Sequence, residues 1–121
     1  MEEVVRRETI QRVATPTALL VGVAEPLAQA CTDALSDGGL KVLRVGHVAA
    51  ACERIPVIMP QLVVVAASIR QEESDMLADR CVAVGAEVLK VATDASIDPA
   101  LRAMLKDAAN MALIRSLRRG D

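Results

Sequence analysis

This 121-residue sequence contains no phenylalanine, tyrosine or tryptophan, although 53% of its residues are hydrophobic. Proteins commonly hold single-stranded nucleic acid by stacking bases on aromatic side chains, so the sequence excludes that mode of binding. The aromatic anchors typical of protein interfaces are missing as well, which leaves Leu, Met and Arg to form any interface. We therefore expect a core of Leu, Val, Ile, Met and Ala, with alanine-rich helices packed close to a sheet.

The sequence also lacks a charge excess, because 14 basic and 16 acidic residues give a formal net charge of −2. Without a basic field we expect no binding to nucleic acid. The three cysteines, Cys31, Cys52 and Cys81, form no C-x-x-C pair, so reduced, buried thiols fit better than a disulfide framework. No apolar run reaches the ~18 residues that cross a bilayer, and the first residues do not read as a secretory signal. A cytoplasmic protein without membrane insertion is the expectation.

Motifs of catalysis and cofactor binding are missing too. Neither G-x-x-x-x-G-K-[ST] nor G-x-G-x-x-G occurs in the sequence, so no phosphate-binding loop is indicated. His47 is the single histidine; no second imidazole could complete a metal site, and nothing in the sequence places His47 beside a cysteine. We predict that the chain is not an enzyme and needs no cofactor or metal.

Short apolar runs alternate with helical stretches from Ala18 onward, which is typical of βα units and a parallel sheet. Residues 1–16 are a charged lead-in, either a short helix or an arm, so the expected domain is 17–121. The expected strands are 18–23, 41–45, 61–66 and 87–92. The expected helices are 26–37, 48–55, 74–84 and 98–117, with Pro26 at the first helical position, Gly38–Gly39 as a left-handed cap, and Pro56 closing the second helix.

Two segments carry a more specific signal. The letters LLVGVAEP stand at 19–26 and PQLVVVAAS at 60–68. Both resemble a response-regulator receiver domain (CheY-like), whose first strand ends in an acidic pair before a Glu-Pro-like step. In that family the third strand follows a Pro-Asp-Leu-Val pattern and ends in the Asp that takes the phosphoryl group. Here the acidic pair falls on Val23 and Ala24, and the phosphoacceptor falls on Ala66.

The resemblance covers about residues 18–119 and is clearer in the first half. The switch Thr/Ser after strand four matches Ala92 or, one residue later, Thr93, and Lys90 lies two residues before the place of the family's lysine. A three-layer, flavodoxin-like parallel sheet with helices on both faces is implied. Only one strand follows strand three, so we expect four strands and one shortened βα unit. The lost unit is either the fifth or, if Gly85–Ala86–Glu87 precedes strand five, the fourth.

Phosphoryl transfer to a receiver needs Mg²⁺ held by oxygen ligands, which Val23, Ala24 and Ala66 do not have. Glu25 alone cannot hold the ion. The resemblance therefore implies a non-catalytic pseudo-receiver, a protein–protein interaction module of bacterial signalling or cell organisation that is not regulated by Asp phosphorylation. Two alternatives stay open: a small α/β module that binds a nucleotide or cofactor, and a structural subunit that forms homo-oligomers.

The carboxyl ends of the expected strands, where ligands usually bind in open α/β sheets, carry a short set of polar and glycine residues. The set is Gly22, Glu25, Gly46, His47, Ser68 and Thr93. A small anion could be held there by backbone N–H groups at helix starts. Turns and caps explain the same residues, and we expect Glu25 and Ser68 to cap helices and His47 to be a surface or capping residue.

The last helix is the stronger candidate for a binding surface, because the run 111–117 is apolar on more than one face. Such a helix must cover its surplus against something, either the lead-in 1–16 or another protein. Expected partners are another signalling protein, a second copy in a homodimer, or both. The candidate partner-binding residues are Met111, Leu113, Ile114, Arg115, Leu117 and Arg118.

Overall fold

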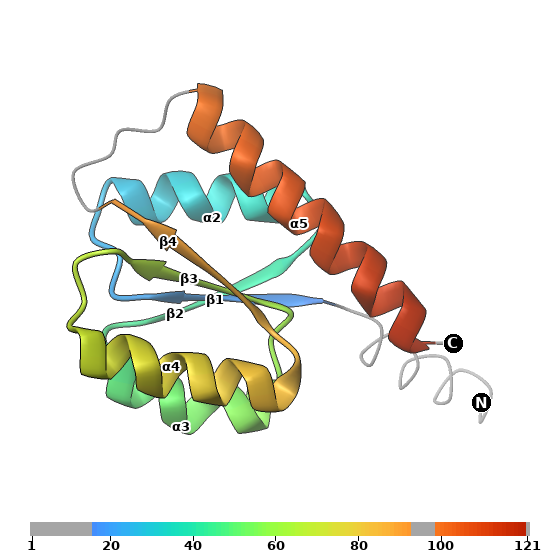
Figure 1. Cartoon of the computed structure of the whole chain (residues 1–121). Helices are drawn as coiled ribbons and strands as arrows, with labels where there is room; N and C mark the ends of the chain where they lie inside the picture. The colour runs from blue at the N-terminus through green and yellow to red at the C-terminus, as the bar shows by residue number, and fades with distance from the viewer. Residues whose placement is uncertain (1–15, 93–98, 121) are drawn as a thin grey trace, which may run out of the picture.

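The computed structural model describes residues 16–92 and 99–120, with side chains as far as Leu117. Four parallel strands form one sheet in the order β2-β1-β3-β4 (Figure 1). The strands are β1 (Thr17–Val21), β2 (Lys41–Val45), β3 (Leu62–Ala66) and β4 (Glu87–Val91). The helices are α2 (Leu27–Asp37), α3 (Val48–Ile58), α4 (Gln71–Val84) and α5 (Pro99–Gly120). The expected four-stranded, flavodoxin-like α/β fold is confirmed.

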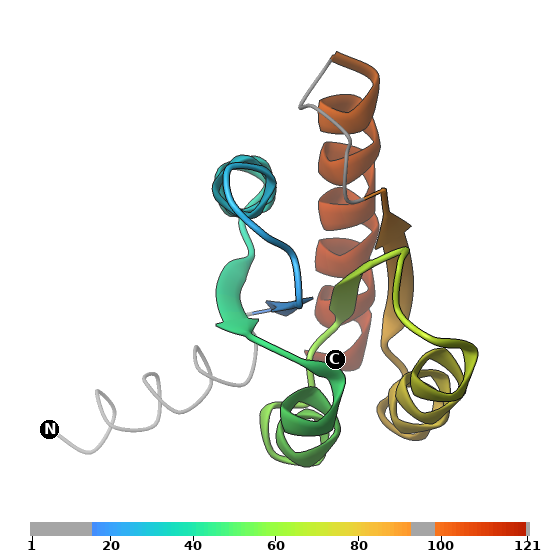
Figure 2. The same cartoon turned by 90° about the vertical axis from the view of Figure 1, so that its left-hand side faces the viewer.

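The sheet separates two hydrophobic clusters, each covered by a pair of helices. Figure 2 shows α2 and α5 on one face and α3 and α4 on the other. The first cluster includes Leu20, Leu35 and Leu105, and the second includes Leu19 and Ile55. Adjacent leucines of β1 enter opposite clusters because successive side chains of a strand point to opposite faces. The structure is therefore three-layered.

The central and edge strands differ as their sequences predict. All five residues of β3 (LVVVA) are buried, since a central parallel strand is covered on both faces. The edge strands β2 and β4 contain exposed charged residues, among them Arg44 and Lys90. Within the described residues no helix is long and apolar enough to cross a membrane.

Helix boundaries depart from the sequence expectations at several points, three of which involve proline or glycine. α3 continues through Pro56 to Ile58 and ends at Met59, whose φ is +53°; proline in the last turn disturbs only the end of the hydrogen-bond ladder, so the helix was not closed there. Gly38 has φ −79°, and it is Gly39, at +97°, that takes the left-handed conformation. Pro26 is the N-cap of α2 and not its first helical residue.

The crossing of α2 and α5 depends on Gly38. A Cβ atom at this position would lie 2.6 Å from the Cβ of Ala109 in α5. Glycine therefore lets the end of α2 approach α5 more closely than any other residue could. Toward its N-terminus, α2 diverges from α5, as Figure 1 shows.

Candidate functional site

The carboxyl end of the sheet is where the receiver resemblance places phosphorylation. β1 and β3 are neighbours, paired up to Val21↔Val65, so the chain leaving β1 lies beside Ala66. The Ala66 side chain is only 2% exposed, Val23 packs against the α2–α5 cluster, and Ala24 is exposed. None of these three side chains carries an oxygen atom, so none can be a ligand of Mg²⁺.

A small pocket of about 230 Å³ lies at this end, between the strand ends and the starts of α3 and α4. Its polar wall consists of His47, Ser68 and Glu73. Two of these side chains already accept hydrogen bonds from backbone N–H groups at the helix starts. His47 Nδ1 accepts a hydrogen bond from Ala50 N at 3.2 Å, and Glu73 Oε1 accepts one from Arg70 N at 3.3 Å. Among the described residues, no group of three or more His, Cys, Asp or Glu could hold a metal ion.

The helix caps at this end match the sequence expectations only in part. His47 is the N-cap of α3, as a capping role predicted. Glu25 Oε2 accepts a hydrogen bond from Gln29 N at 3.3 Å, so it caps the start of α2. Ser68 does not cap α4, because the N-cap is Arg70 and α4 begins three residues earlier than expected. The signal for this start was the acid Glu73, which lies three residues after the cap.

Glu25 also belongs to a polar cluster on the β2 side of α2. The Arg44 guanidinium donates to Glu25 Oε1 and, at 2.9 Å, to Gln29 Oε1, while its Nε donates to Thr32 Oγ1 at 3.2 Å. One arginine therefore joins β2 to the first two turns of α2. The carboxylate of Glu25 is engaged and does not stand free for a metal ion.

The remaining receiver positions lie on β4 or after it. Ala92 follows the strand and is exposed, while Thr93 is outside the described residues. Lys90 is exposed in the interior of β4, where it is paired in register with Val65. Its Cα is therefore before the end of the strand, as the sequence spacing indicated.

The strand order shows which position of a five-stranded sheet is unoccupied among the described residues. A flavodoxin-like sheet with five strands has the order 2-1-3-4-5. In this chain β4 pairs with β3, and α5 then returns to the face of α2 (Figure 2). The position left out is thus the outermost strand with the helix that precedes it. Among the described residues, β4 therefore forms one edge of the sheet and β2 the other.

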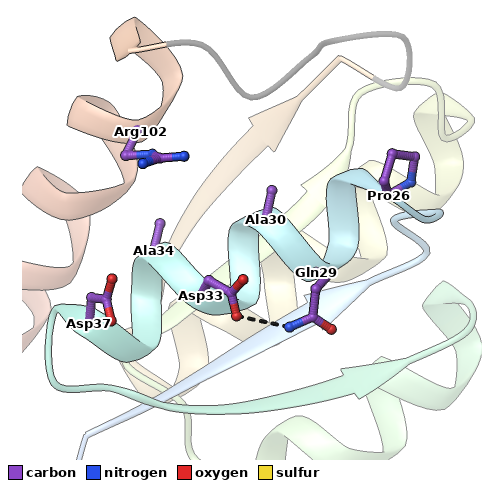
Figure 3. Close-up of a pocket in the computed structure, with 7 residues that line it drawn as sticks. All are labelled: Pro26, Gln29, Ala30, Asp33, Ala34, Asp37 and Arg102. Carbon is purple, nitrogen blue, oxygen red and sulfur yellow. Dashed lines mark hydrogen bonds between the residues drawn. The ribbon is translucent and has the colours of Figure 1, made fainter.

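A larger groove of about 450 Å³ opens where α2 and α5 diverge, and no pattern in the sequence indicates it. Figure 3 shows Arg102 of α5 reaching toward α2, which presents Asp33 and Asp37. Asp33 Oδ1 accepts a hydrogen bond from Gln29 Nε2 at 2.8 Å. All these polar side chains are exposed, so the groove can attract ions but contains no buried polar group that would orient one particular ligand.

The residues predicted for partner binding divide into two groups on α5. Met111, Ile114 and Leu117 are exposed by 46%, 36% and 61%. Leu113 is half-buried and lies beside Gly39 at the end of α2. Arg118 has no described side chain. An apolar surface therefore exists on the outer side of α5, and Leu113 contributes to the α2–α5 contact instead.

Arg115 is already engaged within the chain. Its Nη1 donates to Glu87 Oε1 at 3.2 Å, and its Nη2 donates to the carbonyl oxygen of Gln61 at 3.0 Å. The same carbonyl accepts the N–H of Glu87 at 3.1 Å. This set, which we call the Arg115 clasp, joins α5 to β4 and to the residue before β3 at the amino end of the sheet. A role of Arg115 in partner binding stays a prediction.

All three cysteines are buried and free, as expected. Burial raises the pKa of the Cys81 thiol to about 11, and the nearby Cys52 thiol raises it further. Burial also raises the pKa of the Cys31 thiol, against the opposing charge of Arg44. Since thiolates are the nucleophilic form, Cys31 and Cys81 are poor nucleophiles.

A comparison with solved structures supports this fold. The structure is similar to the signal receiver domain of a putative Luxo repressor protein from Vibrio parahaemolyticus, with a TM-score of 0.55 and 18% sequence identity. The similarity covers 87% of this chain and 95% of that domain. No protein-family model and no curated protein matches the chain. The fold is that of a receiver domain.

Proposed function

We propose that this chain is a pseudo-receiver: a non-catalytic interaction module of bacterial signalling or cell organisation whose output does not depend on aspartate phosphorylation. The observation that carries the proposal is the chemistry of the carboxyl end. A receiver fold presents its phosphoacceptor at the end of β3, and this chain has Ala66 there, beside Val23 and Ala24. A methyl group is no nucleophile, and the side chains of Val23 and Ala24 supply no oxygen for Mg²⁺.

Acetyl phosphate with Mg²⁺ tests the proposal directly. The intact mass of the full chain should show no added phosphoryl group. The triple variant Val23→Asp, Ala24→Asp, Ala66→Asp returns carboxylates to the three positions, and a gain of one phosphoryl group by that variant would show that only these oxygens were missing. One acid-labile phosphoryl group on the wild-type chain would refute the proposal.

The outer side of α5 is the surface that we propose for a partner protein. Met111, Ile114 and Leu117 are each three residues apart, so they cross the exposed side of the helix in one diagonal row. A second signalling protein could cover them without disturbing the core. The double variant Ile114→Glu, Leu117→Glu should lose a specific partner in a pull-down while its thermal unfolding stays close to that of wild type.

Leu113→Glu is the matched control, because this side chain packs at the end of α2. It should lower the unfolding temperature, whereas the double variant should not. Strong destabilisation by the double variant would show that Ile114 and Leu117 stabilise the fold and are not available to a partner.

The pocket at the carboxyl end favours one other function, binding of a small nucleotide or cofactor. Gly22 and Gly46 leave backbone accessible there, and the first turns of α3 and α4 present N–H groups. A ligand at a hundred times its dissociation constant would stabilise the chain by about 2.7 kcal/mol. A thermal-shift screen therefore separates this function from the interaction module.

A further inference from the structure

The edge of the sheet at β4 has backbone groups that face outward. Glu87 N donates to Gln61 O, and Val91 O accepts from Ala67 N, so residues 87 and 91 bond to the side of β3. Bonding direction alternates along a strand of a parallel ladder. The N–H and C=O groups of Val88 and Lys90 therefore point away from β3, and β4 pairs with no other described strand.

The two faces of this edge are incompletely covered. Val88 packs at the border of the α3–α4 cluster and Leu89 at the border of the α2–α5 cluster, and both are only half-buried. Their register partners in β3, Val63 and Val64, are fully buried. The hydrophobic layers thus extend to β4 but are not closed there.

One flank of α5 extends the apolar surface over the same edge. Arg115 marks this flank, because it reaches Glu87 of β4. Met111 is four residues before Arg115 and Met104 eleven before it, which places both on the same side of the helix. Their side chains are 46% and 43% exposed. The opposite flank, with Arg102, faces α2.

We propose that a second copy of this chain binds at the β4 edge. The two copies are related by a two-fold axis that is perpendicular to the sheet and passes between the two Leu89 residues. The two β4 strands then run antiparallel. Val88 of each copy lies opposite Lys90 of the other, and this pair exchanges both backbone hydrogen bonds. All four outward N–H and C=O groups of each copy are satisfied. The two Leu89 side chains meet on the α5 face, where Met104 and Met111 of both copies cover them.

Charge favours this register over the antiparallel register shifted by one residue toward Lys90. Moving the axis to Lys90 would place the two lysines opposite each other, which destabilises a strand pair. With the axis at Leu89, each Lys90 faces an apolar residue. A two-fold contact is also closed, so it adds one copy and no more. The net charge of −2 is too small to keep two copies apart.

The other edge strand, β2, does not offer the same surface. Its outward groups belong to Val42 and Arg44, because Lys41 N and Val45 O bond on the side of β1. The Arg44 side chain is held by Glu25, Gln29 and Thr32 of the adjoining helix region. This edge is bordered by polar side chains, whereas the β4 edge is bordered by methionines.

Sedimentation of the full chain over a concentration series tests the inference with two matched variants. Val88→Lys places lysine opposite Lys90 twice in each dimer and should weaken dimerisation by about tenfold. Val88→Glu is equally polar at the same site but faces Lys90 with an opposite charge, so it should dimerise at least as well as wild type. Equal dimerisation of the two variants, or a monomer at every concentration, would overturn the proposal.

A proline pair gives an independent readout. Lys90→Pro removes an outward N–H without touching the ladder to β3, and proline is tolerated in such an edge position. It should abolish the dimer. Val42→Pro makes the same change at the β2 edge and should leave the dimer intact; loss of the dimer in this variant and not in Lys90→Pro would place the contact at β2 and contradict the inference.

The inference deepens the proposed interaction role by naming one partner. Sedimentation uses no phosphodonor, and the mass measurement on acetyl phosphate does not depend on the oligomeric state. A phosphorylated chain would therefore refute the pseudo-receiver, and a monomeric one would refute the dimer, without either result being mistaken for the other.

Discussion

The two ends of the sheet differ in what their polar residues do. At the carboxyl end, where a receiver carries its chemistry, the polar side chains cap helices or join α2 to β2: His47 caps α3, Glu73 caps α4, and Arg44 holds Glu25. At the amino end, Gln61 is buried and Arg115 half-buried, and the Arg115 clasp joins α5 to β4 and to the residue before β3. The polar contacts described at the carboxyl end thus serve α2, α3 and α4, whereas the Arg115 clasp holds the last helix to the sheet.

Gly38 and Gly46 give the largest expected contrast between the ends. Gly38→Ala forces a Cβ to within 2.6 Å of Ala109, so α5 must shift, and the free energy of unfolding should fall by about 1–3 kcal/mol. Gly46→Ala meets no atom within 4 Å at the carboxyl end and should be neutral or slightly stabilising. Denaturant unfolding of both variants measures the contrast, and equal effects would remove it.

The Arg115 clasp gives the next contrast. Arg115→Ala leaves the Glu87 carboxylate without its partner and removes a charged donor from the Gln61 carbonyl, so we expect a loss of about 1–3 kcal/mol in unfolding free energy. Arg44→Ala removes a more exposed cluster at the other end, and the expected loss is at most about 1 kcal/mol. Chemical denaturation in low and high salt compares them. A larger loss of unfolding free energy for Arg44→Ala than for Arg115→Ala would show that the polar contacts at the carboxyl end contribute more to stability.

The smallest expected effect on stability is that of Cys81, which lies on the face of the sheet covered by α3 and α4. Its folded pKa of about 11 lies above the ordinary 9.0, so its contribution to stability is complete below pH 9 and is lost as the pH rises through 11. Part of the alkaline decline in stability should vanish in Cys81→Ala, as followed by thermal unfolding against pH. An unchanged decline in the variant would assign it to other groups.

The sequence predicted the sheet better than it predicted the contacts between helices. Continuous apolar runs fixed β3, and Gly46 and Lys41 bounded β2, because burial and turn chemistry act on neighbouring residues. The predicted end of α3 at Pro56 was wrong, since proline disturbs a helix less when few turns follow it. The Arg115 clasp and the groove beside Arg102 join residues far apart in the chain, and helical spacing along one segment does not contain that information.

The absence of oxygen ligands at the three receiver positions, in contrast, could be predicted from Val23, Ala24 and Ala66 alone. This prediction needed only the assignment of β1 and β3 as neighbouring strands, and the two receiver-like segments, 19–26 and 60–68, indicated that assignment. What those segments could not show is that β4 is an edge strand among the residues that the structure describes. The open edge follows from strand pairing, which no single segment encodes.

We propose that the carboxyl end has no phosphoryl-transfer site. A titration with Mg²⁺ and beryllofluoride, followed through the amide signals of the full chain by NMR, tests this proposal most directly. Gly22, Gly46 and Ala66 line the pocket at this end, so their backbone amide signals report on binding there. We expect that none of these signals shifts in a saturable manner in the wild-type chain, whereas the triple Asp variant shows such shifts. Saturable shifts of these signals in the wild-type chain would contradict it.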